Sequence, residues 1–158
     1  MSRLSHYFNY TVERYGMMAT CKEEVENILA DFRKRGIPVA VINEHLQGDL
    51  VKFYGVHGTD FFYWFYPSPC SHSKFGLEKI NGIAKGIPFS VEELKIQSDK
   101  AAEALNVPIY GGDCVISADG TLRIIDFNDW PSFARCREEA GPEIAKCIYN
   151  RIIHKLEK

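Results

Sequence analysis

Apolar and polar residues alternate along several short stretches of the chain, and a period of two residues is typical of a strand with one buried face. Residues 49–57 and 60–66 alternate in this way around Gly58-Thr59, a dipeptide suited to a tight turn. The pattern therefore predicts a β-hairpin over these residues. A shorter run, Val39–Asn43, is apolar almost throughout and predicts a buried strand.

Two capping boxes predict helix starts, at Thr20–Glu23 and at Ser90–Glu93. Gly36 and Pro38 are expected to end the first helix, and a third helix is expected over about 137–155. The apolar residues at helical spacing are Val25, Ile28, Leu29 and Phe32 in the first helix, and Leu94, Ser98, Ala101 and Leu105 in the second. Helices combined with hairpins predict an α+β fold, in which helices pack against a mostly antiparallel sheet as one domain over residues 1–158.

The most informative pattern lies near the end of the chain, where residues 113–118 and 121–127 alternate around Asp119-Gly120. This dipeptide is typical of a two-residue type I′ hairpin turn. In such a hairpin residue 118 faces residue 121, which places Asp113 opposite Asp126. Asn128 shares the face of Asp126, because side chains two residues apart lie on the same side of a strand.

Carboxylates that oppose each other across two strands repel, and a cation between them removes the repulsion. Two carboxylates and an amide oxygen form a hard oxygen site suited to Mg²⁺ or Mn²⁺, which usually shares its coordination with substrate phosphates. Ile125 and Phe127 are expected to bury the opposite face and so to fix the side that the carboxylates occupy. The alternative is that Asp113, Asp126 and Asn128 are solvated residues at strand ends.

The sequence Gly-Gly-Asp113, a short hairpin, and then Ile125-Asp-Phe-Asn-Asp-Trp-Pro-Ser-Phe133 resembles the end of an ATP-grasp fold. The resemblance is to the carboxy-terminal half of that fold, in the glutathione-synthetase-like or inositol-phosphate-kinase-like lineage. It implies that Asp113, Asp126 and Asn128 are ligands of Mg²⁺. It also implies that residues 37–133 are the core of the large carboxy-terminal lobe.

The same resemblance assigns the nucleotide contacts to residues just before and within the first hairpin. It implies Glu44, His45 and Leu46 at the adenine, Asp49 near the ribose and Lys52 on the phosphates. Loop solvation is the alternative for Glu44 and Asp49, and a protective edge-strand lysine is the alternative for Lys52. The aromatic residues of the 61–66 run are expected to be sheet core rather than a base-stacking surface.

The chain departs from complete ATP-grasp enzymes in the part before residue 37. The family's small lobe carries a phosphate-binding lysine, whereas residues 1–36 offer one remnant strand, in which Arg14 could partly replace that lysine, and one helix. Family members transfer phosphate from Mg²⁺-ATP to a carboxylate, or less often to a hydroxyl. Three functions therefore stay open: part of a carboxylate–amine ligase or small-molecule kinase, a non-catalytic nucleotide-binding module, and a truncated fragment. Arg135 and Arg137 either contact an acceptor or are solvated at a helix start.

Composition narrows the choice of partners. The chain has 158 residues and a formal net charge of −2, which gives no electrostatic footprint for nucleic acid. It has no apolar run long enough for a bilayer and no signal-peptide pattern, and its five cysteines lack Cys-x-x-Cys spacing, so a cytoplasmic location is expected. The expected ligands are ATP, Mg²⁺ and an unidentified small-molecule or peptide acceptor. A second copy or a partner chain is expected to cover the face left by the absent lobe.

Overall fold

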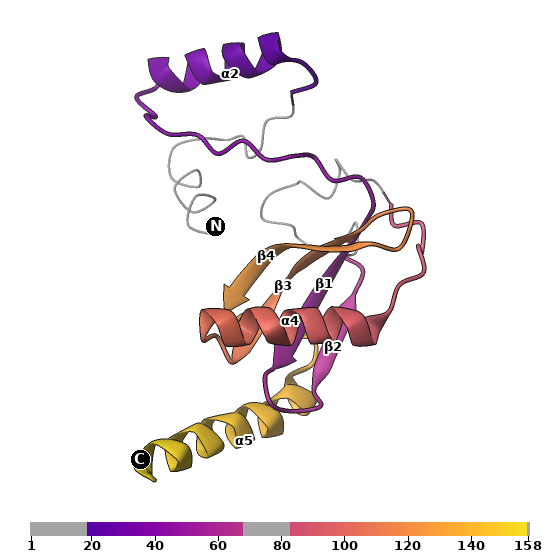
Figure 1. Cartoon of the computed structure of the whole chain (residues 1–158), viewed down its shortest axis with the longest axis vertical. Coiled ribbons are helices and arrows are strands. Elements are labelled where there is room, and N and C mark those ends of the chain that lie inside the picture. Colours follow the sequence, from indigo (N-terminus) through magenta and orange to yellow (C-terminus); the bar gives the residue numbers. More distant parts are fainter. Residues whose placement is uncertain (1–18, 68–82, 158) are drawn as a thin grey trace.

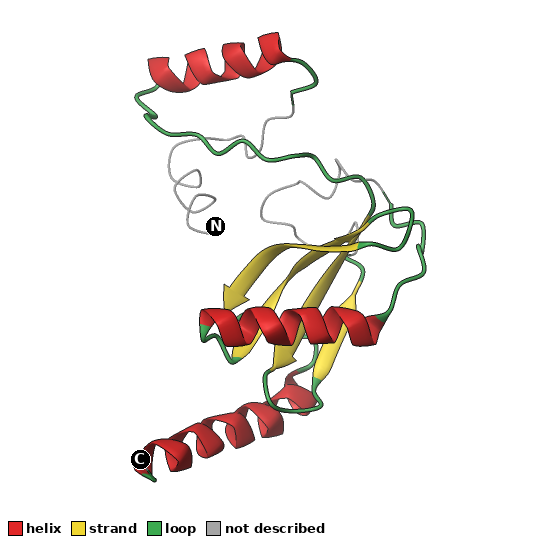
Figure 2. Cartoon of the chain, in the orientation of Figure 1, coloured by secondary structure: helices red, strands yellow, loops and turns green. Residues whose placement is uncertain are grey.

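The computed structural model describes residues 19–67 and 83–157. These residues form three helices and one four-stranded antiparallel sheet, an α+β arrangement (Figures 1 and 2). The elements are α2 (Lys22–Lys34), β1 (Asp49–Val56), β2 (Phe62–Phe65), α4 (Val91–Leu105), β3 (Ile109–Ile116), β4 (Leu122–Asp129) and α5 (Arg137–Leu156). The strand order is β2-β1-β3-β4, so two strands that are distant in sequence, β1 and β3, form the central pair.

One face of the sheet packs against α4, which crosses the strands in Figure 1. This helix begins as the second capping box predicts, because Ser90 Oγ accepts a hydrogen bond from the Glu93 backbone N–H at 3.0 Å. The predicted hairpin over 49–66 and the predicted C-terminal helix are confirmed as β1–β2 and α5. The core between α4 and the sheet comprises Val51, Phe53, Leu94, Ala102, Tyr110, Cys114, Ile116 and Leu122.

The buried stripe of α4 differs from its predicted course. Leu94, Ser98 and Ala102 are buried, whereas Leu105 is 59% exposed. The buried residues follow each other at intervals of four, and Leu105 falls off this line. The helix then ends at Asn106, whose φ of 54° is left-handed.

The first predicted capping box does not form. Helix α2 begins at Lys22, which places Cys21 at the N-cap, and Thr20 donates instead from its backbone N–H and its hydroxyl to the Glu24 carboxylate. Gly36, with a φ of 72°, follows the end of the helix as expected. In the part of the chain that the structure describes, no helix combines the length and the apolarity that crossing a membrane requires.

The predicted strand at Val39–Asn43 is also absent. Residues 37–47 have no regular structure, and Val39, Val41 and Ile42 are between 45% and 67% exposed. The segment does not join the sheet, whose order among the described residues is β2-β1-β3-β4 with β2 and β4 at the two edges. Helix α2, which lies apart from the sheet in Figure 1, has no buried residue.

The turn between β3 and β4 is not the predicted two-residue type I′ turn. Ser117 and Thr121 close a three-residue loop, with hydrogen bonds from Ser117 N–H to Thr121 O at 3.0 Å and from Gly120 N–H to Ser117 O at 2.8 Å. A type I′ turn requires a positive φ at both Asp119 and Gly120, whereas only Gly120, at 81°, has one in this loop. The Asp-Gly dipeptide suits this longer loop equally well, because its glycine takes the left-handed position.

A β-bulge at Ile125 restores the predicted pairing of the two carboxylates. Cys114 pairs with Ile124, but Asp113 pairs with Asp126, so Ile125 is the extra residue in β4. The bulge shifts the alternation by one residue, and Leu122 and Ile124 therefore face the core. Ile125, which the sequence pattern placed inside, is 47% exposed.

Candidate functional site

Lys52, Asp113 and Asp126 lie in one row across β1, β3 and β4. Lys52 pairs in register with Asp113, and Asp113 with Asp126. Their side chains occupy the sheet face turned away from α4, here called the open face, because the flanking Val51 and Cys114 are buried in the core on the other face. Lys52 Nζ donates to both carboxylate oxygens of Asp113, at 2.9 and 3.1 Å. The two carboxylates thus oppose each other as predicted, with an ammonium group beside one of them.

Asn128 completes the predicted trio on the open face. It pairs with Gly111, and its Nδ2 donates a hydrogen bond to the Asp126 carboxylate. Rotating the Asn128 amide group by a half-turn about its Cβ–Cγ bond exchanges the positions of Nδ2 and Oδ1. The acceptor Oδ1 then points toward the carboxylates. Over residues 19–67 and 83–157, no cluster of three or more His, Cys, Asp and Glu side chains is placed to hold a metal ion. Asp113, Asp126 and Asn128 are not such a cluster, because only two of the three are of these residue types and the third ligand would be an amide oxygen.

The donor set fits Mg²⁺ or Mn²⁺, because every candidate ligand atom is a hard oxygen. The side chains of Lys52 and Asp113 are 31% and 24% exposed, so an ion or a phosphate can reach them from solvent. A partly exposed ion pair of this kind contributes no more than about 1 kcal/mol to the free energy of unfolding. A divalent ion or a polyphosphate can therefore compete for either partner at little cost.

An aromatic cluster occupies the β1–β2 half of the open face, next to Lys52. It consists of Tyr54, Tyr63, Phe65 and Phe133. Tyr54 stacks on Tyr63 with ring centroids 6.5 Å apart and contacts Phe65 and Phe133 at 5.9 and 5.4 Å. The expectation that the 61–66 run is sheet core holds for Trp64 and its neighbour Phe62, which pack against the core cluster, but Tyr63 and Phe65 face the other way.

The aromatic cluster brings two further polar groups to the site. The Arg135 guanidinium lies 4.3 Å from the ring centroid of Phe65, a cation–π contact that holds it over the open face. The Tyr54 side chain is near Lys52, Asp113 and Arg135, and burial raises the pKa of its hydroxyl above the usual 10.0. Tyr54 was not predicted as a site residue, although its position two residues after Lys52 in an alternating strand places both side chains on the same face.

Two adjacent glycines allow the strands and rings of the site to approach closely. A Cβ at Gly111 would lie 2.6 Å from the Tyr54 ring and 2.8 Å from Pro131. A Cβ at Gly112 would lie 2.1 Å from the Asp126 backbone oxygen. The Gly-Gly pair before Asp113 is therefore required for packing at the site.

Asp49, which the family resemblance placed near a ribose, lies away from this site. Its side chain is 3% exposed and accepts the backbone N–H groups of Lys85 and Ile87, at 2.7 and 2.8 Å. It pairs in register with Ile116, on the face that packs against α4. Both carboxylate oxygens are thus engaged in holding the segment that leads into α4.

The remaining predicted residues are not brought to the open face by regular structure. Glu44 and His45 are exposed and Leu46 is half-buried, all within the irregular segment that precedes β1. Arg14 lies outside the described residues. Arg137 is exposed at the first position of α5.

Comparisons with protein-family models, with curated proteins and with solved structures find no match to this chain. The likeness to the ATP-grasp fold therefore rests on the residues quoted from the sequence.

Proposed function

We propose that the chain binds ATP together with Mg²⁺ or Mn²⁺ on the open face of its sheet, in the manner of the large carboxy-terminal lobe of an ATP-grasp protein. One observation carries the proposal: a lysine and two carboxylates form a continuous row across three strands, with Asn128 beside them on the same face. The family resemblance assigns the same residues to the nucleotide and the metal ion.

In this proposal Asp113, Asp126 and Asn128 hold the ion, and Lys52 contacts the phosphates. Bound Mg²⁺ would neutralise part of the charge on the phosphate oxygens, which favours phosphoryl transfer. The Lys52 ammonium has three N–H donors, so it can bind a phosphate oxygen without leaving Asp113. Adenine contacts from Glu44, His45 and Leu46 remain what the resemblance implies, whereas Asp49 is left out because both of its oxygens are engaged.

Arg135 extends the site on the β2 side of Lys52, where it lies over Phe65, and Tyr54 extends it two residues along β1. A guanidinium that lies flat on an aromatic ring keeps its outer N–H groups for an anion. These two residues suit an acceptor that carries a carboxylate or a hydroxyl. The corresponding reaction is phosphoryl transfer of the ligase or small-molecule kinase type.

A non-catalytic nucleotide-binding module is the second candidate, and the exposure of the N-terminal segment favours it. Val39, Val41 and Ile42 are exposed, and α2 lies apart from the sheet in Figure 1. In a complete ATP-grasp enzyme the small lobe closes over the nucleotide. Where bound phosphates are open to water, every electrostatic contact with them is weakened.

Calorimetric titration with ATP, with and without Mg²⁺, tests the proposal. The variants are Asp126→Asn and Lys52→Gln, with Asp60→Asn and Lys100→Gln as controls that change the same charge at exposed positions. We expect Mg²⁺-dependent binding in the wild type and in both controls. Affinity should fall about tenfold or more in each site variant, because each loses at least one charge-assisted contact. Binding of Mn²⁺ alone, followed by electron paramagnetic resonance, should be weakened only by Asp126→Asn.

Equal heats in all five proteins would overturn the proposal and leave the Lys52–Asp113 pair as a structural contact. ADP formation by the chain alone, once binding is established, would favour the enzyme. Binding without ADP formation would favour the module.

A further inference from the structure

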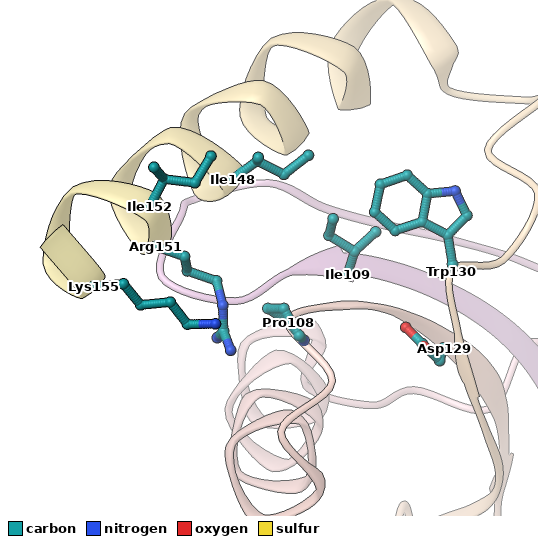
Figure 3. Close-up of a pocket in the computed structure, with 8 residues that line it drawn as sticks. All are labelled: Pro108, Ile109, Asp129, Trp130, Ile148, Arg151, Ile152 and Lys155. Atoms are coloured by element: carbon teal, nitrogen blue, oxygen red, sulfur yellow. The ribbon is translucent and has the colours of Figure 1, made fainter.

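A pocket of about 240 Å³ lies between the end of β4 and the C-terminal half of α5, and none of the site residues discussed so far lines it. Figure 3 shows Ile148 and Ile152 on α5 across from Ile109 and Trp130, with Pro108 below Ile109. Ile148 and Ile152 are 40% and 52% exposed. Apolar side chains thus form most of the pocket but do not close it.

Trp130 adopts a backbone conformation that core packing does not explain. Its φ of 51° lies in the left-handed region, which costs a bulky L-residue on the order of 1–3 kcal/mol. Its backbone N–H donates to the Ile109 oxygen at 3.0 Å, which fixes the residue at the end of the sheet. The indole is nevertheless 60% exposed. The indole in this unfavourable backbone conformation therefore presents a large aromatic surface to the pocket and not to the core.

The charges around the pocket are unevenly distributed. Arg151 and Lys155 stand one helical turn apart on α5, and Figure 3 shows both side chains reaching toward the same side of Pro108. Arg151 donates to Asn106 Oδ1 at 2.7 Å, which holds the guanidinium at the pocket while leaving other N–H groups for a ligand. Asp129 lies below Trp130, on the other side of Pro108. The pocket therefore has a cationic end and a single negative charge at the opposite end.

We propose that this pocket binds a small apolar monocarboxylate. Its apolar body would pack against Trp130, Ile148 and Ile152, and its carboxylate would contact Arg151 and Lys155. The volume suits one small molecule, and Asp129 disfavours a second anionic group. This binding does not depend on the proposed nucleotide site.

The test uses 3-phenylpropanoate as the probe, with the neutral 3-phenylpropanamide as its matched control. The chain has two tryptophans, so their indole N–H signals can be followed separately by NMR. Trp64 serves as the internal reference, because it packs against Phe89 and Tyr66 in the core region. We expect the acid to shift the Trp130 signal saturably and to leave the Trp64 signal unchanged, and we expect the amide to bind at least about threefold more weakly.

Arg151→Gln and Lys155→Gln should each weaken binding of the acid about threefold without changing binding of the amide. Lys146→Gln, at an exposed position of α5 outside the pocket, is the control and should bind the acid like the wild type. Lys155 lies exposed in the last turn, so its variant keeps the test valid if Arg151→Gln unfolds. The proposal is overturned if the Trp130 signal does not move, if the amide binds as well as the acid, or if both cation variants bind the acid like the wild type.

Discussion

Replacing Asp49 with asparagine should lower the free energy of unfolding by about 2–4 kcal/mol. The carboxylate is 3% exposed and accepts two backbone N–H groups at 2.7 and 2.8 Å. Asparagine keeps one acceptor oxygen but turns an NH₂ group toward the second N–H. The variant therefore loses one hydrogen bond to a charged group, about 1.5–3 kcal/mol, and leaves a buried donor without an acceptor.

Urea unfolding followed by tryptophan fluorescence measures this change. Trp64 reports on the affected region, because its ring centroid lies 4.9 Å from that of Phe89, at the end of the segment that Asp49 holds. Asp60→Asn is the matched control, since it removes the same charge at an exposed position and should change the unfolding free energy by no more than about 0.5 kcal/mol.

The difference between wild type and Asp49→Asn should depend on pH. Burial alone would raise the pKa of Asp49, but the N–H groups of Lys85 and Ile87 outweigh it and hold the pKa below the ordinary 3.8. A carboxyl whose native pKa is lowered stabilises the fold above its unfolded pKa. The difference should therefore be complete near neutral pH and should shrink as the pH falls below 3.8.

Two results would contradict this reasoning. An Asp49→Asn protein as stable as the Asp60→Asn control would show that the two hydrogen bonds contribute little. A variant of normal stability that binds ATP weakly would instead support the ribose role that the family resemblance assigned to Asp49.

Further predictions concern backbone and packing. Gly112→Ala should lower the unfolding free energy by at least about 3 kcal/mol in urea titrations, because its Cβ would meet the Asp126 backbone oxygen. Gly141→Ala is the control, since Gly141 lies in α5 with open space around it, and this change should be neutral or stabilising by up to about 1 kcal/mol. Ser90→Ala should cost about 1 kcal/mol by the same assay, and a loss under 0.3 kcal/mol would exclude the cap as a contributor. Deleting Ile125 should keep a cooperative thermal transition, because it removes only the extra residue of the bulge and leaves Ile124 opposite Cys114 and Asp126 opposite Asp113, and Ile125→Thr should likewise melt within a few degrees of the wild type.

The strands of the two hairpins, the helix after Ser90 and the helix α5 could be predicted from local patterns. Alternation and capping residues act within a few positions, so the sequence displays them directly. The Val39–Asn43 strand was predicted from a short apolar run and is absent, since such a run alone does not determine whether a segment joins a sheet. The turn at Asp119-Gly120 was mistaken because one dipeptide suits two loop lengths.

The candidate site could be predicted only in part. Asp113 and Asp126 do oppose each other, yet the reasoning reached this pairing through a turn that is too short and without the bulge that compensates for it. The ion pair between Lys52 and Asp113 joins residues 61 positions apart through the β1–β3 pairing, which no local pattern displays. The contact of Arg135 with Phe65 and the conformation of Trp130 likewise depend on how distant segments pack.

The separation of α2 from the sheet implies two levels of local stability in one chain. Amide protons of β1 and β3 lie in the central strands over the buried core, so their exchange with solvent deuterium requires opening of the whole sheet. Helix α2 has no buried residue, and it can unwind while the sheet stays intact. A deuterium-exchange map should therefore show α2 labelled long before the strands, and any partner that docks on α2 would be visible as slower labelling of that helix alone.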